Sequence, residues 1–136
     1  ATVPEVVKPG FVLAEDESED GIGIHGEPGY RNESMQPSRL LAEELTGKLL
    51  EAFDAKSGDR YALLINGMGA TPLMEQYVFA NEVASILGDA GLDMAYKKLG
   101  NYMTSIDMAG LSLTLMKIED EAWLEALESP VKTIAW

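Results

Sequence analysis

The sequence contains no cysteine and a single histidine, His25, among its 136 residues. Without thiols the chain can form no disulfide, thiolate nucleophile, cysteine-type zinc site or iron–sulfur cluster. Because the acidic residues around the lone histidine show no zinc-site or EF-hand spacing, we expect no bound metal. The lack of cysteine is compatible with a reducing compartment, and we predict a cytoplasmic protein.

Basic residues and long apolar runs are also scarce. Ten Lys and Arg stand against 23 Asp and Glu, which gives a net charge of −13. This charge repels phosphate backbones and anionic lipids, so neither nucleic acid nor a membrane is an expected partner. No apolar run approaches the roughly 20 residues that span a bilayer, and the order of a signal peptide is missing. The 46% apolar content instead indicates a globular fold with a hydrophobic core.

The first ten residues have the composition of a linker. They lack an initiator methionine and hold Pro4, Pro9 and Gly10. We therefore predict that residues 1–10 are a linker from a missing upstream domain. Methionine removal or trimming of a complete small domain is the alternative.

Two short segments follow the linker. Residues 15–20 hold five acids, which are costly to bury unpaired, so we expect a solvated edge or loop there. Residues 21–29 alternate Gly and Ile and then break at Gly26, Pro28 and Gly29. This pattern predicts a short strand that runs into a turn.

From Pro37 onward the hydrophobic pattern predicts alternating helices and strands. Leucines four residues apart indicate an amphipathic helix from Pro37 to Ser57-Gly58, and the apolar run 61–65 indicates a strand buried on both faces. Further along we expect a helix with Thr71 as N-cap and Pro72 at its first position, which ends near residues 88–91. Strands are expected at 94–99 and 110–118. A short helix from 119 to Pro130 and an extended, docked tail at 131–136 complete the chain. This order predicts an α/β fold, with α+β as the alternative.

Three places could carry chemistry. His25 lies among glycines, where the backbone can approach a small ligand closely, although a histidine that hydrogen-bonds a turn is the simpler interpretation. The loop 66–72 joins a strand to a helix N-terminus, but it lacks the Gly-Lys-Ser/Thr ending of a P-loop, so tight packing explains its glycines better. In the segment 100–110, Tyr102 and Asp107 are expected to be structural hydrogen-bonding residues without a catalytic role.

Three sequence motifs, taken together, indicate a family resemblance. They are Gly21-Ile-Gly-Ile-His-Gly-Glu-Pro-Gly29, Leu63-Leu-Ile-Asn-Gly-Met-Gly-Ala-Thr-Pro-Leu-Met74 and Gly100-Asn-Tyr-Met-Thr-Ser-Ile-Asp-Met-Ala-Gly-Leu-Ser-Leu-Thr-Leu115. In order and spacing they resemble the second half of the dihydroxyacetone kinase K subunit, from about Lys8 to Trp136. The resemblance implies that residues 11–136 form the second domain of that subunit, with a mixed β-sheet flanked by helices. The family's first domain, with its Gly-Gly-Gly-Ser-Gly-His-Glu-Pro motif, has no counterpart in this sequence.

The resemblance also implies an activity and partners. His25 matches the histidine that bonds covalently to the substrate carbonyl of dihydroxyacetone as a hemiaminal. ATP or ADP with magnesium belongs to a nucleotide-binding L-type subunit or domain, so we expect no cofactor on this chain, and the chain alone would be catalytically incomplete. A homodimer and a missing N-terminal K domain are implied as well. Two questions stay open: the phosphoryl donor can be ATP or a phosphoenolpyruvate-dependent relay, and the alternative function is a transcriptional coactivator that binds the same ketose.

Overall fold

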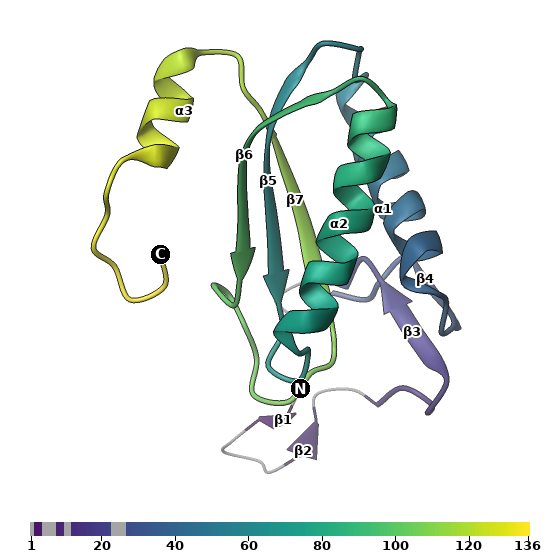
Figure 1. Cartoon of the computed structure of the whole chain (residues 1–136). Helices are drawn as coiled ribbons and strands as arrows, with labels where there is room; N and C mark the ends of the chain where they lie inside the picture. Colours follow the sequence, from purple (N-terminus) through teal and green to yellow (C-terminus); the bar gives the residue numbers. More distant parts are fainter. Residues whose placement is uncertain (1, 4–7, 10–11, 23–26) are drawn as a thin grey trace. The chain divides into compact units, whose positions relative to one another are not determined.

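The computed structural model describes residues 2–3, 8–9, 12–22 and 27–136, and it divides into two compact units (Figure 1). The first unit is Ala1–Pro37 and the second is Ser38–Trp136. The predicted linker boundary at residue 10 lies outside the described residues and stays a prediction. His25 and most of the predicted strand around it also lie outside them.

The first unit contains two antiparallel hairpins. Strand β1 (Thr2–Val3) pairs with β2 (Lys8–Pro9), and β3 (Glu17–Asp20) pairs with β4 (Arg31–Ser34). The expectation of a solvated edge or loop at residues 15–20 is confirmed except at its last residue: most of the acidic block forms β3, a strand of a two-stranded sheet, and Asp20 is buried. At its end Asp20 is only 6% exposed, and its carboxylate lies 3.8 Å from the guanidinium of Arg31 on β4. A cation opposite the carboxylate offsets part of the cost of burying it.

The second unit is built on a three-stranded mixed sheet in the order β6-β5-β7. The central strand β5 (Arg60–Gly67) pairs in parallel with β6 (Asp93–Gly100) and antiparallel with β7 (Leu111–Lys117). Three helices accompany these strands: α1 (Ser38–Phe53), α2 (Leu73–Asp89) and α3 (Glu121–Glu128). The predicted α/β fold with a mixed sheet is confirmed.

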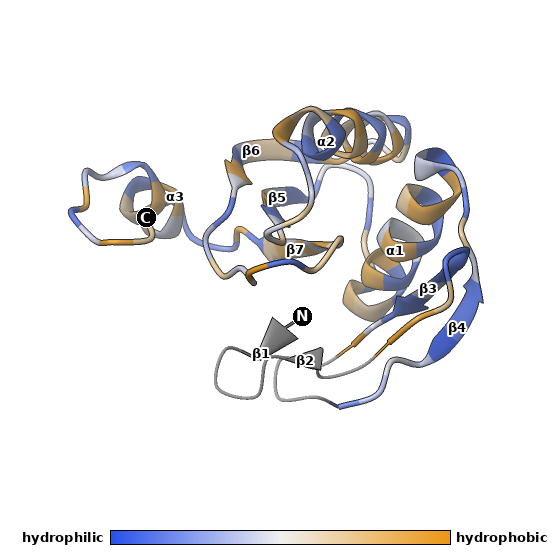
Figure 2. Ribbon diagram, turned by 90° about the horizontal axis from the view of Figure 1, so that it is seen from below, coloured by the Kyte–Doolittle hydropathy of each residue, from blue (hydrophilic) through white to orange (hydrophobic). Residues whose placement is uncertain are grey.

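The hydrophobic core lies between the sheet and the helices α1 and α2 (Figure 2). Alternate residues of β5 face this core, as the two-residue period of a strand requires. Ala62 faces the other way and packs in a second cluster with Ile118 and Leu124 of the α3 side. The prediction that the run 61–65 is buried on both faces is confirmed. The main core comprises Ala42, Tyr61, Leu63, Ile65, Phe79, Val83, Leu87, Leu92 and Leu115.

Helix ends differ from the sequence prediction at two places. Helix α1 ends at Phe53, before the predicted Ser57-Gly58, because Asp54 adopts a φ of 48° that a helix does not continue through. Thr71 is not the N-cap of α2: Pro72 holds that position without a side-chain hydrogen bond. The short third helix is confirmed, and the Asp120 carboxylate caps it by accepting a hydrogen bond from the backbone N–H of Ala122.

The C-terminal residues 131–136 form no strand but dock through their last side chain. The ring of Trp136 lies 5.2 Å from the ring of Tyr102, and the Nζ of Lys98 lies 3.5 Å from the centroid of the Trp136 ring. Lys98 lies on β6 and Tyr102 lies in the loop that follows this strand, so the predicted docking of the tail is confirmed. Among the described residues, no helix has the length and apolar character needed to cross a bilayer.

Candidate functional site

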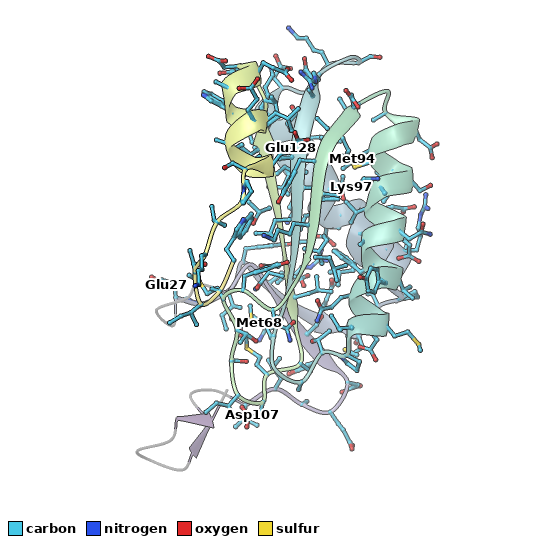
Figure 3. The ribbon with its side chains drawn as sticks, turned by 60° about the vertical axis from the view of Figure 1, so that its left-hand side comes forward. Glu27, Met68, Met94, Lys97, Asp107 and Glu128 are labelled. Atoms are coloured by element: carbon cyan, nitrogen blue, oxygen red, sulfur yellow. The ribbon has the colours of Figure 1, made fainter. Side chains whose placement is uncertain are left out.

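Two loops meet at one edge of the mixed sheet. Since β5 and β6 are parallel, their carboxyl ends at Gly67 and Gly100 lie at the same edge, and β7 begins there at Leu111. The loops 66–72 and 101–110 leave from these ends, and Figure 3 labels one residue in each, Met68 and Asp107. In open α/β sheets this edge is the usual place for a ligand.

The side chain of Asn66 organises the second loop. It is 4% exposed, and its Nδ2 donates a hydrogen bond to the carbonyl oxygen of Met103 at 2.7 Å. Its Oδ1 accepts from the backbone N–H groups of Tyr102 at 2.8 Å and Met103 at 2.9 Å. One amide therefore fixes the beginning of the loop 101–110 to the end of β5.

Two further side chains join the loops. The Nε2 of Gln76, in the first turn of α2, donates to the backbone carbonyl of Thr71 at 3.1 Å and to Oδ1 of Asn101 at 2.8 Å. The hydroxyl of Thr71 donates to the carbonyl of Gly110 at 2.6 Å, and it accepts from the N–H of Gly110 at 2.7 Å. The second loop is thus held at both of its ends.

The glycines of the first loop permit this close approach. A Cβ atom at Gly67 would overlap the side chains of Gln76 and Asn101, and one at Gly69 would overlap the backbone of Ser105 and Ile106. Side chains larger than hydrogen do not fit at these two positions without a shift of the second loop. Tight packing, which the sequence favoured as the explanation of this Gly-containing loop, is confirmed.

Two hollows in the described part of the chain lie away from these loops. One, of about 400 Å³, is lined by Tyr96, Lys98, the end of α3 and the tail with Trp136. The other, of about 420 Å³, lies between the end of α1 and β7. Neither of these two is lined by residues 66–72 or 101–110.

The sequence singled out Tyr102, Asp107 and His25, and the structure describes the first two. The hydroxyl of Tyr102 donates to the carbonyl of Leu99 at 3.1 Å, and burial raises the pKa of this phenol above its usual range, with smaller contributions from Tyr96 and Tyr77. A neutral, hydrogen-bonded tyrosine matches the predicted structural role. Asp107 also has an interaction partner. The role of His25 lies outside the described residues and stays a prediction.

Sequence reasoning missed Asn66 and Gln76, although each leaves a signal. Asn66 is a polar residue at the carboxyl end of an otherwise apolar strand, and Gln76 interrupts the buried stripe of α2. Buried amides require hydrogen-bond partners, so a polar residue at such a position indicates a loop packed against it.

Comparison with known proteins identifies the family. A Dak1 domain model matches residues 1–135. Over all 136 residues the chain is 60% identical to the "PTS-dependent dihydroxyacetone kinase, dihydroxyacetone-binding subunit DhaK" of Lactococcus lactis subsp. lactis, of which it covers 41%. It is 48% identical over 131 residues to the "DhaKLM operon coactivator DhaQ" of the same organism, with 95% of this chain and 40% of that protein covered. The chain thus spans about two fifths of the length of these two relatives.

The fold agrees with the sequence match. A solved structure described as "Regulation of the dha operon of Lactococcus lactis" superposes with a TM-score of 0.83 and 45% sequence identity, over 92% of this chain and 40% of that one. The family model and the structural likeness both cover nearly the whole chain. This chain belongs to the Dak1 domain family.

Proposed function

We propose that the protein is the dihydroxyacetone-binding component of a dihydroxyacetone kinase and that His25 holds the ketose covalently. The observation that carries this proposal is the 60% identity, over the full chain, with a subunit named for binding dihydroxyacetone. The string Gly23-Ile-His-Gly-Glu-Pro28 around His25 supports the assignment of the residue.

The chemistry suits a neutral imidazole. Its unprotonated nitrogen adds to the carbonyl carbon of the ketose, so that an N–C bond forms while the carbonyl π bond breaks. The carbonyl oxygen takes up a proton, and the other ring nitrogen releases one, which leaves a neutral hemiaminal. Glycerol has no carbonyl group and cannot be held in this way, so the covalent bond selects the ketose. A ketose fixed at its central carbon also presents its terminal hydroxyl in one place for phosphoryl transfer.

Phosphoryl transfer needs groups beyond this chain. The loop 66–72 has no Gly-Lys-Ser/Thr ending and no basic residue, and the net charge of −13 disfavours a nucleotide site. We propose that a nucleotide-binding L-type subunit or domain carries ATP or ADP with magnesium, and that an N-terminal K domain completes the substrate site. A cytoplasmic location and a homodimer complete this proposal.

Intact-protein mass spectrometry of the full-length gene product with dihydroxyacetone tests the covalent bond. A hemiaminal adds the whole mass of one ketose, whereas an imine on a lysine would add that mass less one water. We expect the full-mass adduct with dihydroxyacetone and none with glycerol. His25→Ala should abolish the adduct, and Lys98→Ala should retain it. An adduct that persists in His25→Ala, or one that has lost water, would contradict the assignment.

A coactivator that senses dihydroxyacetone is the second candidate. It is favoured by the 48% identity with DhaQ, which is named as an operon coactivator. Both candidates predict the same adduct, so turnover separates them. With a nucleotide-bearing partner and its phosphoryl donor supplied, the kinase component forms dihydroxyacetone phosphate in a coupled assay, whereas a coactivator forms none.

A further inference from the structure

Asn66 is followed directly by Gly67, and the sequence contains no other Asn-Gly pair. An asparagine in this context is chemically labile, because the backbone nitrogen of the next residue can attack the side-chain amide and glycine has no Cβ atom to hinder the approach. A bond forms between the nitrogen of Gly67 and Cγ of Asn66, the bond from Cγ to Nδ2 breaks, and the amide nitrogen leaves as ammonia with the proton of Gly67. Water then opens the resulting succinimide ring to aspartate or isoaspartate.

The packing of the sheet edge requires both residues of this pair. Asn66 provides the amide that binds the loop 101–110, and Gly67 provides the space for it. A Cβ atom at Gly67 would lie 2.6 Å from Oδ1 of Asn101 and would also overlap the side chain of Gln76. A larger second residue, which would slow the attack, therefore does not fit without a shift of the loop. The labile pair thus follows from the architecture of the site.

The folded state holds the amide of Asn66 in hydrogen bonds that the reaction must break. Its Nδ2, which is the leaving nitrogen, donates to the carbonyl of Met103, and its Oδ1 accepts from two backbone N–H groups. Attack requires the side chain to turn toward the nitrogen of Gly67 and the backbone of Asn66 to rotate. Because Gly67 is in register with Leu111 of β7, this rotation would disrupt the ladder. Water also has little access, since Asn66 is buried.

The loop 101–110 is the least supported part of this site. None of its residues, all of which the structure describes, belongs to a helix or strand, and Met103 and Ile106 are 60% and 66% exposed. Segments with few buried contacts open locally at a lower free-energy cost than the whole fold. Such an opening would release the amide of Asn66 while the core between the sheet and the helices stays folded.

We propose that Asn66-Gly67 is a deamidation site gated by the loop 101–110, closed while the loop is docked and reactive when the loop is released. The reaction is one-way. An aspartate at this position has no N–H to donate, and its negative oxygen faces the carbonyl of Met103. Isoaspartate also inserts an extra carbon into the backbone of β5 and shifts its register. Deamidation thus converts a transient opening of the loop into a permanent one, and this proposal does not depend on the proposed function.

Peptide mass spectrometry of the full-length gene product tests the protection by the fold. The protein is incubated in mildly alkaline buffer, both folded and in guanidinium chloride, and the digested peptide that holds Asn66 is followed over time. The deamidated peptide has gained one water and lost one ammonia, which its mass reports. We expect conversion to be at least about tenfold slower in the folded state. Equal rates in the folded and the unfolded chain would overturn the proposal.

Substitutions that loosen the loop without touching the reacting pair test whether the loop is the gate. Thr71→Val removes the hydroxyl that holds Gly110, at one end of the loop. Asn101→Ala removes the acceptor of the hydrogen bond from Gln76, at the other end. In native buffer each variant should deamidate about threefold to tenfold faster than wild type, because each loses hydrogen bonds that keep the loop docked.

The matched control is Leu92→Ala. Leu92 is a core residue next to the start of β6, at the opposite end of the sheet from the loops, so its truncation lowers overall stability but leaves the loop docked. We expect this variant to deamidate at the wild-type rate in native buffer. If neither loop variant reacts faster than Leu92→Ala, the loop is not the gate. Circular dichroism shows which variants are folded before incubation, and either folded loop variant suffices for the comparison.

Discussion

Asn66 and Met103 exchange two hydrogen bonds: the Nδ2 of Asn66 donates to the Met103 carbonyl at 2.7 Å, and the Met103 N–H donates to Oδ1 of Asn66 at 2.9 Å. A side-chain amide thus takes the place that a neighbouring strand would take in a sheet. It reaches a residue 37 positions away and ties the loop after β6 to the end of β5.

Removal of the Asn66 amide should destabilise the fold. Asn66→Ala removes the hydrogen-bond partner of the part-buried backbone groups of Tyr102 and Met103, so we expect the free energy of unfolding to fall by about 1–3 kcal/mol. Asn66→Asp keeps the acceptor oxygen but loses the donor, and it should also destabilise the chain. Urea denaturation measures both. The exposed Asn32→Ala is the control, with an expected change within about 0.5 kcal/mol. An equal loss of stability in Asn32→Ala would show that Asn66 contributes no more than an exposed asparagine.

Gly67→Ala should separate the two loops. The new Cβ would overlap Gln76 and Asn101, which must move and give up their hydrogen bond. We expect a loss of roughly 1–3 kcal/mol, as for other overpacked sites. Gly47→Ala, where the Cβ meets nothing within 4 Å, should instead stabilise α1 by up to about 1 kcal/mol. Thermal unfolding of the two alanine variants gives opposite shifts if the loops are packed as described, and shifts of one sign would contradict it.

The stability contributed by Asp59 should be lost in acid. Its carboxylate accepts a hydrogen bond from the backbone N–H of Lys56 at 3.0 Å and lies 3.4 Å from Nζ of Lys117. The Lys56 N–H, and then Lys117, lower the pKa of Asp59 below its ordinary value of 3.8, against a smaller opposing effect of desolvation. The folded state therefore binds this proton less readily than the unfolded state. The contribution of Asp59 to stability is therefore complete at pH values well above 3.8, its ordinary pKa. It disappears as the pH falls through the lowered pKa of the folded state.

Thermal unfolding across pH measures this effect. The difference in Tm between wild type and Asp59→Asn should be largest above about pH 5 and shrink toward about pH 2. Glu125→Gln on the exposed side of α3 controls for the general titration of acids. A difference for Asp59→Asn that grows in acid would have the wrong sign for a lowered pKa.

The Lys98 ammonium over Trp136 should be visible in fluorescence. The Nζ lies 3.5 Å from the ring centroid, so Lys98→Met removes a charge that acts directly on the indole. In a Trp123→Phe background, where Trp136 is the only remaining indole, we expect a shift of the emission maximum and a loss of about 0.5–1 kcal/mol in stability. Lys97→Met on the same strand serves as the control. Identical spectra for the two lysine variants would show that the tail does not dock on Lys98.

The sequence predicted the second unit better than the first because apolar runs and apolar periodicity mark its elements. The run Tyr61–Ile65 is apolar throughout, the leucines of α1 lie four residues apart, and each of these segments forms the predicted element. In contrast, β3 is almost entirely acidic and has no apolar alternation, so its pairing with β4 could not be read from local pattern. Strands of this kind are specified by their partner rather than by their own residues.

The candidate site was predicted as separate loops but not as a joined framework. The sequence identified the glycines near residues 67–69 and the polar segment 100–110, yet the bonds from Gln76 to Asn101 and from Asn66 to Met103 link positions 25 and 37 residues apart. Which distant carbonyl satisfies a buried amide depends on strand order, and strand order follows only from the assembled sheet. Thr71 illustrates the same limit: its hydroxyl, a standard helix cap by sequence, bonds instead to Gly110 across the site.

The central position of β5 has a consequence for synthesis. Both of its partners follow it in the chain, β6 after the whole of α2 and β7 later still. On the ribosome, β5 therefore remains an apolar segment with at least one open edge until Lys117 has emerged. The hairpin β3–β4, whose strands lie close in sequence, can close at once. During translation the apolar strand β5 thus stays incompletely paired, and the charged residues at its start, Asp59 and Arg60, disfavour pairing with another chain.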